Sequence, residues 1–289
     1  MSSKLDPRRN AFRPDVADAR LRGKVEAERF VEGQRQRVKI PMLPVAERPG
    51  ADFPMTTQAL MGEDVLVFAA AKDWAWVQLA RDGYVGYVRR AALTDELPEL
   101  THQVKAQFAL TFERPDIKSQ QGWYIPFGAR LHARPAGAFV EAAGSGFIPV
   151  QHVAGIDHVA EDFVAVAERL LGVPYLWGGK TCFGIDCSGL IQLSLRAAGL
   201  DAPRDSDLQA AEIGDPLPRS DWKCLKRGDL VFWRGHAGIM SDTTRLLHAN
   251  AHHMCVIKEP LETVIARAEA NSSPVTAIRR LPKLSTSKV

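Results

Sequence analysis

The pattern of apolar residues changes once along the chain, near Gly155, and this change limits the folds that the sequence can adopt. Before it, residues 37–94 and 104–153 consist of short alternating runs such as DVLVFAAA and GWYIPFGARL, bounded by Gly, Pro or Asp. Such runs predict short β-strands joined by turns. After it, DHVAEDFVAVAERLLG has apolar residues at helical spacing, which predicts a helix. We expect two small β-barrels followed by an α+β domain.

These patterns divide the chain into four parts. Residues 1–36 form an extension in which Ala, Leu and Val at helical spacing predict an amphipathic helix over residues 15–31. Residues 37–97 and 100–154 are the predicted barrels, and residues 156–289 are the α+β domain. A chain of 289 residues exceeds the usual size of one domain, so its length agrees with several compact parts.

Composition and charge exclude several classes of protein. The formal net charge of +3 is small for this length and no long block of like charge occurs, so a nucleic-acid partner is not expected. No apolar stretch reaches the roughly 18 residues of a membrane-spanning helix. Residues 1–33 lack the apolar segment of a secretory signal. We expect a cytoplasmic protein without a membrane partner, and the sequence leaves its oligomeric state open.

One cysteine differs in its context from the others. The chain has 4 cysteines at irregular spacing, so we expect reduced thiols, and without a CxxC pair a zinc site is set aside. Cys187 follows the Gly-rich WGGKTCFGID and opens CSGLIQLSLRAAGL, a predicted helix. The partial positive charge of a helix N-terminus lowers the pKa of a thiol, and the first backbone N–H groups can stabilise an oxyanion. Cys187 is therefore a candidate nucleophile, with a buried structural thiol as the alternative.

A cysteine nucleophile needs a base, and two histidines are candidates for the rest of such a site. His236 opens a predicted strand directly after a Gly turn, and His248 lies on the next predicted strand. A hairpin of these strands places the two rings side by side. We predict that His236 is the general base and that His248 orients it and holds its tautomer. The alternative is that both are packed or surface residues, which is our interpretation of the other histidines.

Three segments resemble the NlpC/P60 family of cysteine peptidases. GVPYLWGGKTCFGIDCSGLIQLSLRAAGL resembles its catalytic signature, KRGDLVFWRGHAGIM the strands around its catalytic histidine, and RLLHANA the strand with its third polar residue. They occur in the family's order. The resemblance implies a papain-like α+β fold and a triad of Cys187, His236 and His248. It also implies hydrolysis of amide bonds in bacterial cell-wall peptides without a metal or organic cofactor.

The two predicted barrels resemble bacterial SH3-like domains, which precede the catalytic domain in some members of this family. Those members are similar to peptidases that cut the γ-D-Glu to diamino-acid bond of murein peptides with a free N-terminal L-Ala, in peptidoglycan recycling. The resemblance implies six substrate-binding residues, Glu63, Tyr84, Tyr175, Asp186, Ser188 and Ser206. The identity of the diamino acid stays open.

The implied roles of these residues differ. Carboxylates of Glu63 and Asp186, with Tyr84, would match the charge of the substrate ammonium and offset its desolvation. Both serines would contact the substrate backbone, and Tyr175 would assist the oxyanion. Plainer alternatives are a solvated turn residue for Glu63, a barrel-core aromatic for Tyr84 and a helix N-cap for Asp186.

Other functions stay open beside this one. The same cysteine and histidines can transfer an acyl group to an amine or lipid when water is excluded. A lytic or remodelling hydrolase of the intact wall would use the same site, although the absence of an export signal favours recycling of imported fragments. A non-catalytic module that binds wall peptides is the third alternative, and the complete triad argues against it.

Overall fold

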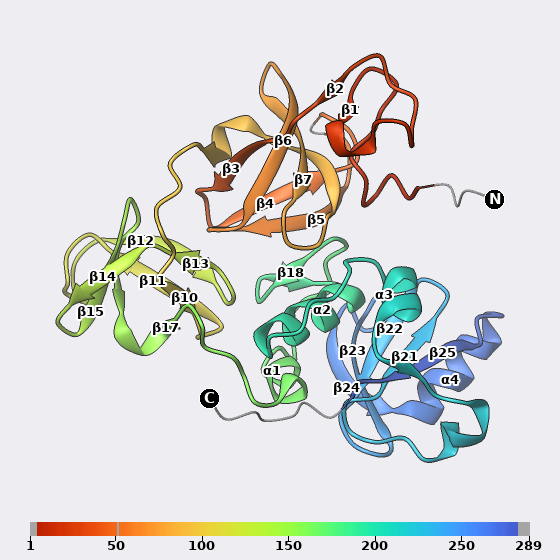
Figure 1. Ribbon diagram of the computed structural model, residues 1–289. Helices are drawn as coiled ribbons and strands as arrows, with labels where there is room; N and C mark the ends of the chain where they lie inside the picture. Colours follow the sequence, from red (N-terminus) through yellow and green to blue (C-terminus); the bar gives the residue numbers. More distant parts are fainter. Residues whose placement is uncertain (1–4, 51, 283–289) are drawn as a thin grey trace. The chain divides into compact units, whose positions relative to one another are not determined.

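The computed structural model describes residues 5–50 and 52–282. The chain forms two compact units, Met1–His158 and Val159–Val289, which are described separately below. Figure 1 shows that the first unit consists mainly of strands, whereas the second combines helices with a sheet. Within the described residues, no helix is long and apolar enough to cross a membrane.

The N-terminal extension contains no α-helix from residue 5 onwards, so the helix predicted over residues 15–31 is wrong. Its elements are β1 (Ala17–Asp18), the 3-10 helix η1 (Ala19–Leu21) and β2 (Phe30–Val31). The strands β1 and β2 pair in parallel. Ala11 and Val16 are buried against Phe68 and Trp76. Tertiary packing on the neighbouring sheet thus overrides the local helical spacing of the apolar residues.

A seven-stranded antiparallel sheet follows, in the order β5-β4-β8-β7-β6-β3-β9. Its elements are β3 (Gln34–Val38), β4 (Met42–Ala46), β5 (Met55–Leu60), β6 (Asp64–Ala71), β7 (Trp74–Leu79), β8 (Val85–Arg89), η2 (Arg90–Ala92) and β9 (Leu93–Thr94). Val65, Val77 and Val88 share its buried core. The expected closed barrel is not confirmed, because the described strand order is open and the two-residue β9 pairs with β3 alone.

The second β region contains two sheets, in the orders β13-β10-β17 and β12-β11-β16-β15-β14, so a single closed barrel is not confirmed here either. Its elements are β10 (His102–Val104), β11 (Phe108–Phe112), β12 (Gln121–Pro126), β13 (Arg130–Leu131), β14 (Ala133–Ala136), β15 (Phe139–Ala142), β16 (Gly146–Pro149), η3 (Val150–His152) and β17 (Val153–Gly155). Leu60 and Met61 of the first region enter its core. A β-carbon on Gly62 would lie 2.3 Å from the carbonyl oxygen of Arg130, so this close approach requires glycine.

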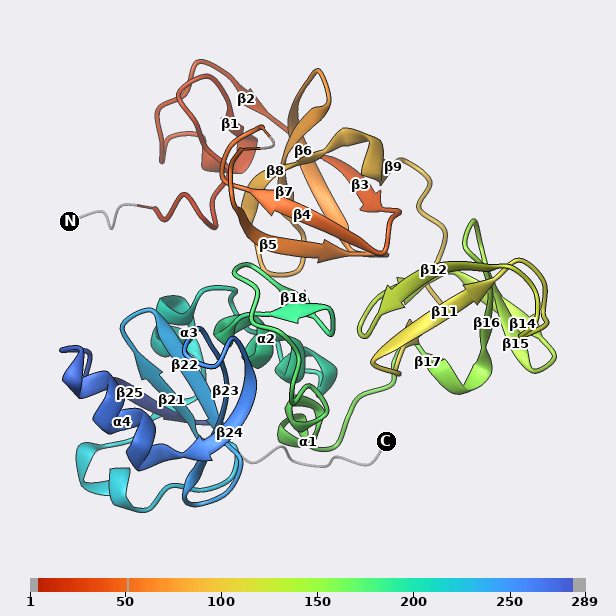
Figure 2. The same cartoon turned by 180° about the vertical axis from the view of Figure 1, so that it is seen from behind.

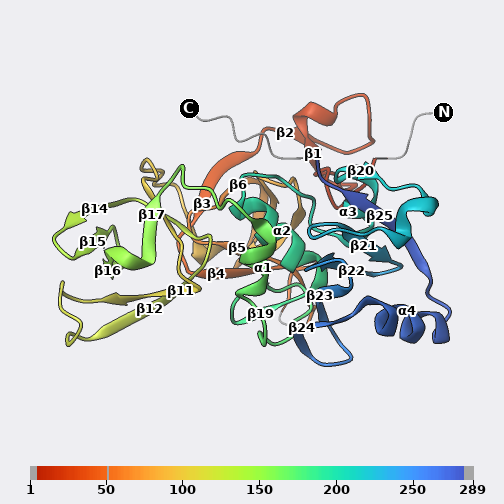
Figure 3. The same cartoon turned by 90° about the horizontal axis from the view of Figure 1, so that it is seen from below.

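The second unit is an α+β domain, as predicted, built on an antiparallel sheet in the order β20-β25-β21-β22-β23-β24. Its strands are β18 (Lys180–Thr181), β19 (Gly184–Ile185), β20 (Asp215–Pro216), β21 (Leu230–Trp233), β22 (His236–Met240), β23 (Arg245–Asn250), β24 (Cys255–Pro260) and β25 (Val275–Arg280). Its helices are α1 (Phe163–Glu168), α2 (Cys187–Ala197), α3 (Ser206–Glu212), the 3-10 helix η4 (Arg219–Lys223) and α4 (Leu261–Ala270). Figures 2 and 3 show α2 and α4 on opposite sides of the sheet.

Alternation along the strands explains how the sheet of the second unit packs against α4 on one face and α2 on the other. Successive residues of a strand point to opposite faces. Val231, Trp233 and Met240 share one core cluster with Val264 of α4. The helix α2 packs against β22 and β23 from the other side. The start of α2 and the start of β22 therefore belong to neighbouring layers.

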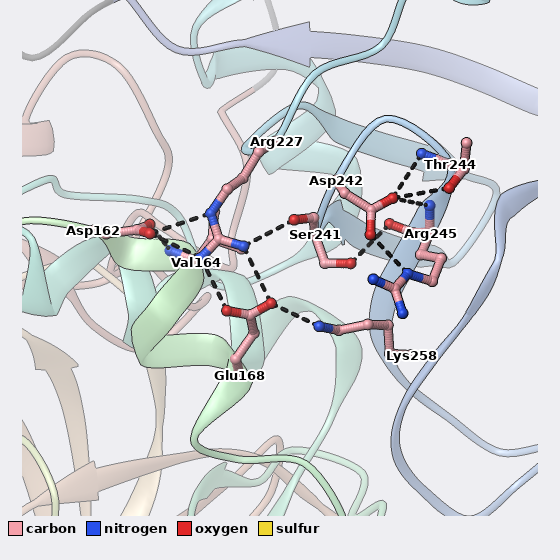
Figure 4. Close-up of polar contacts among 9 residues, drawn as sticks. All are labelled: Asp162, Val164, Glu168, Arg227, Ser241, Asp242, Thr244, Arg245 and Lys258. Carbon is pink, nitrogen blue, oxygen red and sulfur yellow. Dashed lines mark hydrogen bonds and ion pairs between the residues drawn. The ribbon is translucent and has the colours of Figure 1, made fainter.

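An ion-pair cluster around Arg227 joins α1 to this sheet (Figure 4). The Arg227 guanidinium donates to Asp162, the N-cap of α1, at 2.8 Å, to Glu168 at 2.9 Å and to the carbonyl oxygen of Ser241 at 2.8 Å. Lys258 of β24 also donates to Glu168, at 2.8 Å. The hydrogen bond from Arg227 is the main reason that the pKa of Glu168 is lowered to about 2.

We expect Arg227→Met to destabilise the second unit by roughly 1–2 kcal/mol at neutral pH, because three partners lose a partly exposed cation. The expected loss is smaller at pH 3. With a folded pKa of about 2 against an ordinary 4.5, the contribution of Glu168 is complete above pH 4.5 and disappears as the pH falls towards 2. Urea unfolding at pH 7 and at pH 3 measures the change in the free energy of unfolding. The exposed neighbour Lys226→Met is the control, and equal losses at both pH values would contradict the assignment.

Candidate active site

The loop before α2 determines where Cys187 lies. The predicted helix start is confirmed: Cys187 is the first residue of α2 and Asp186 is its N-cap. The Asp186 carboxylate accepts hydrogen bonds from the backbone N–H groups of Gly178, at 2.8 Å, and Gly189, at 2.7 Å. Because a β-carbon on Gly189 would lie 2.3 Å from the carbonyl oxygen of Gly179, only glycine lets the helix start pack this closely on the loop.

The Cys187 thiol is buried, with 6% of the residue exposed. Burial, followed by the adjacent Asp186 carboxylate, raises its pKa to about 12, against the opposing effect of hydrogen bonds from the backbone N–H groups of Ala237 and Ser188. Burial and the carboxylate thus outweigh the expected lowering of the pKa by the helix N-terminus, to which the backbone N–H of Ser188 contributes. The Ala237 contact places the sulfur beside the backbone of β22, one residue along the strand from His236.

A two-residue turn after β21 positions His236. Gly235, the second residue of this turn, has a φ of 75°, a left-handed conformation that favours glycine. His236 consequently begins β22 directly opposite Trp233, and the two rings lie 5.6 Å apart. At the other end of this hairpin, Asp242 accepts hydrogen bonds from the backbone N–H groups of Thr244, at 2.8 Å, and Arg245, at 2.9 Å. That turn sets the pairing of β22 with β23.

The two predicted histidines are in contact, as expected. Nε2 of His236 lies 2.7 Å from Nδ1 of His248. Burial and the neighbouring His248 lower the pKa of His236 to about 3. Burial also lowers the pKa of His248, although its hydrogen bond with Glu259 opposes this shift. Both imidazoles are therefore neutral at neutral pH and able to pass a proton.

The sequence analysis did not predict two charged residues near His248, namely Glu259, which contacts His248, and Arg267, which contacts Glu259. The Nε2 atom of His248 lies 2.9 Å from a carboxylate oxygen of Glu259, and Arg267 of α4 donates to the same carboxylate at 2.5 and 3.1 Å. The available signal was Glu259 within the β-like run CVIKEP. Its position beside His248 depends on the register of β23 with β24, which the sequence does not display.

Asp186 takes part in a buried ion pair. Arg204 donates to its two oxygens at 3.0 and 2.7 Å, and the side chains of Arg204 and Asp186 are only 1% and 8% exposed. Together with its backbone donors, these bonds show Asp186 as the helix cap that was the alternative interpretation. Its role in binding an ammonium stays a prediction. Arg204 was missed, because nothing local in PRDSDLQ indicates burial.

Three other predicted substrate residues lie in the second unit. The Ser188 hydroxyl is buried and accepts a hydrogen bond from Arg204 at 2.8 Å. Ser206 is half-buried at the start of α3. Burial raises the pKa of Tyr175 to about 12, and the nearby Cys187 adds to this shift. Tyr175 therefore lies near the sulfur and keeps its hydroxyl proton at neutral pH.

The remaining two predicted residues, Glu63 and Tyr84, lie in the first unit. A carboxylate oxygen of Glu63 accepts a hydrogen bond from the backbone N–H of Leu60 at 3.2 Å. Tyr84 is 7% exposed and belongs to the core of the first sheet. Both observations agree with the plainer alternatives, so their role in a clamp stays a prediction. Among the described residues no group of His, Cys, Asp and Glu has the arrangement of a metal site.

Sequence models of two families match the chain. The bacterial dipeptidyl-peptidase Sh3 domain matches residues 45–93, and the NlpC/P60 family matches residues 172–270. These matches cover most of the first sheet and the part of the second unit that holds Cys187, His236 and His248.

Two curated proteins and one solved structure are similar over most of the chain. "Gamma-D-glutamyl-L-lysine dipeptidyl-peptidase" of Bacillus subtilis is 31% identical over 233 residues, which are 68% of this chain and 73% of the relative. "Dipeptidyl-peptidase 6" of Lysinibacillus sphaericus is 28% identical over 227 residues, 70% of this chain and 82% of the relative. The crystal structure of an NlpC/P60 family protein from Bacillus cereus superposes with a TM-score of 0.72 at 21% identity, over 86% of this chain and 100% of that chain. That likeness concerns the fold.

Proposed function

The chain belongs to the NlpC/P60 family of cysteine peptidases, and we propose that it hydrolyses the amide bond between γ-D-Glu and a diamino acid in cell-wall peptides. In this proposal Cys187 is the nucleophile, His236 the base and His248 the residue that orients the base. The observation that carries it is the 2.7 Å contact between the two imidazoles on β22 and β23, because the backbone N–H of Ala237, also on β22, donates to the Cys187 thiol.

The chemistry starts from a neutral thiol and a neutral imidazole. His236 takes the proton of the Cys187 thiol while the sulfur attacks the carbonyl carbon, and the imidazolium then protonates the departing amine. Water hydrolyses the thioester, with His236 again taking a proton. The backbone N–H of Cys187 and the protonated hydroxyl of Tyr175 are the proposed donors to the oxyanion. The raised pKa of Tyr175 supports its part as a donor.

The proposed identity of the substrate rests on the names of the relatives. Two of them are named as dipeptidyl-peptidases, and one name specifies γ-D-glutamyl-L-lysine. We propose a substrate with a free L-Ala amine, bound with the help of Glu63 and Tyr84, which lie within the residues matched by the Sh3 model. The second β region would be a further SH3-like domain, and the second unit a papain-like one, since a helix that begins with the cysteine packs on the sheet that carries the histidines.

A set of matched peptides tests this function. L-Ala-γ-D-Glu-L-Lys, its diaminopimelate analogue, an N-acetylated form and a form linked to muramic acid are incubated with the protein, and products are followed by mass spectrometry. Cleavage of the free-amine peptides alone would support the function and a place in the cytoplasmic recycling of wall fragments. Cleavage of all forms would favour a wall-lytic enzyme. Transfer to an added amine instead of water would favour an acyltransferase, and no reaction would favour a binding module.

The pH dependence of hydrolysis should reflect the lowered pKa of His236. Because His236 acts as a neutral base and its pKa is lowered to about 3, we expect kcat/KM at pH 5 to stay within about twofold of its value at pH 7. A base with the ordinary pKa of 6.5 would be mostly protonated at pH 5. A pH profile of kcat/KM measures this effect, and an acid limb near pH 6.5 would contradict an uncharged His236.

A further inference from the structure

We propose that Glu259 is a positioning residue that determines, through His248, which ring nitrogen of His236 carries the proton. The proposal rests on the roles proposed for Cys187 and His236. It concerns a residue two hydrogen bonds away from the base, on a strand that neither the resemblance nor the alternating pattern singled out. Glu259 contacts neither the sulfur nor the base directly, so its effect on the reaction passes through His248.

The register of two strands brings Glu259 to His248. In the antiparallel pair of β23 and β24, His248 lies opposite Ile257 and Leu246 lies opposite Glu259. Opposite residues point to the same face, and diagonal neighbours on that face are within reach of long side chains. Glu259 is such a neighbour of His248, and only 8% of it is exposed.

The two contacts that link Glu259 to His248 and His248 to His236 determine which ring nitrogens carry protons. A carboxylate only accepts hydrogen bonds, so Nε2 of His248, 2.9 Å from Glu259, must carry the hydrogen. Nδ1 of neutral His248 is then an acceptor, and Nε2 of His236 at 2.7 Å must be the donor. The Nδ1 atom of His236 is therefore left with a free lone pair, which is the atom available to take the thiol proton.

Arg267 keeps the carboxylate charged. Burial alone would raise the pKa of Glu259, but hydrogen bonds from Arg267 and His248 outweigh it and lower the value to about 2. The Arg267 guanidinium contacts both carboxylate oxygens, the two-point geometry in which arginine binds carboxylates most strongly. Glu259 is thus ionised over the whole pH range in which the protein is expected to act.

Two further groups lie beside His248 and Glu259, and one of them, Asn250, competes with Glu259 for Nε2 of His248. The side-chain nitrogen of Asn250 lies 3.1 Å from Nε2 of His248, and its oxygen accepts a hydrogen bond from the backbone N–H of His253. An amide nitrogen only donates, so Asn250 would require Nε2 of His248 to be an acceptor, whereas the ionised Glu259, 2.9 Å away, requires it to be a donor. The charged carboxylate is the stronger partner and decides the assignment. The ring of His253 lies 3.6 Å from Glu259 on the outer side. Glu259 thus lies beside both His248 and His253.

Nitrogen-15 NMR of histidine-labelled protein tests the proton positions directly. In the wild-type protein we expect Nε2 of both His236 and His248 to be protonated and both Nδ1 atoms to be unprotonated. Glu259→Gln should shift the His248 nitrogens towards a mixture of tautomers, because an amide can donate as well as accept. A wild-type spectrum with protonated Nδ1 on His236 would overturn the proposal, and this measurement does not depend on the stability of any variant.

Kinetics test the consequence for the reaction. We expect Glu259→Gln to lower kcat for peptide hydrolysis roughly 10- to 100-fold with little change in KM, less than the roughly 10⁴-fold cost of an isosteric change in a group that contacts the base directly. The acid limb of kcat/KM should move to lower pH, because Glu259 favours the imidazolium form of His236. Glu259→Asp should recover part of kcat. Glu269→Gln, on an exposed position of α4, is the matched control and should leave kcat unchanged.

A second probe separates this proposal from the proposed function. The rate at which iodoacetamide alkylates Cys187, followed by mass spectrometry, needs no peptide substrate. We expect both His236→Ala and Glu259→Gln to slow it. Slowing by His236→Ala alone would overturn the role of Glu259 and leave the triad intact. No slowing by His236→Ala would overturn the triad itself, on which the role of Glu259 depends.

Discussion

Cys187→Ala is expected to lower kcat/KM for wall-peptide hydrolysis roughly 10⁴- to 10⁶-fold. Without the sulfur no thioester forms, and the two imidazoles have no proton to take from a nucleophile. The fold should persist, because Asp186 caps α2 with its carboxylate and the backbone of residue 187 keeps its place in the first turn. The loss should therefore appear in kcat/KM and not in the midpoint of urea unfolding.

The matched control for this change is Cys255→Ala. Cys255 is a half-buried thiol on β24 in the same unit, so its loss should leave kcat/KM within about twofold of the wild-type value. Intact-protein mass spectrometry during turnover should show an acyl adduct on the wild-type protein and none on Cys187→Ala. Activity that survives in Cys187→Ala and disappears in another cysteine variant would place the nucleophile elsewhere.

Arg204→Met is expected to destabilise the second unit by roughly 3–5 kcal/mol, the usual cost of breaking a buried ion pair by removing one partner. The change leaves the Asp186 carboxylate buried with only hydroxyl and backbone donors, directly beside Cys187. It also removes the donor to the buried Ser188 hydroxyl. Urea unfolding gives the free energy, and hydrogen exchange over Cys187–Ala197 should show faster opening of α2.

A double-mutant cycle identifies the cause of that loss. Asp186→Asn combined with Arg204→Met removes both charges and should cost less than the sum of the two single changes. Arg204→Lys keeps the charge without the two-point geometry and should give an intermediate loss. Arg234→Met, at an exposed arginine in the turn before His236, is the control. Additive losses across the cycle would contradict direct pairing.

Local patterns in the sequence predicted the reactive end of the second unit. A Gly-rich turn followed by helical spacing is a short-range signal, and it placed Cys187 at the start of α2. A Gly turn between two short strands likewise placed His236 at the start of β22, and the next strand brought His248 beside it. These features depend on turn chemistry and on periods of a few residues, which each segment carries in itself.

Local patterns were wrong where distant packing decides the structure. The helical spacing over residues 15–31 does not produce a helix, because Ala11 and Val16 are buried on Phe68 and Trp76. The strands of both β regions were expected, but strand order and closure depend on pairings between distant segments. The pKa of Cys187 follows burial, which a helix N-terminus does not reveal.

The sequence by itself determined the α+β character of the second unit, the helix that begins at Cys187 and the hairpin that joins the two histidines. Only the tertiary structure decided which charged side chains contact the residues beside them. Arg204 reaches Asp186 from beyond the end of α2, and Glu259 reaches His248 through the register of β23 with β24. A buried charge is tolerated only beside a partner. Such partners are chosen by the packing of the whole unit, and no local pattern displays them.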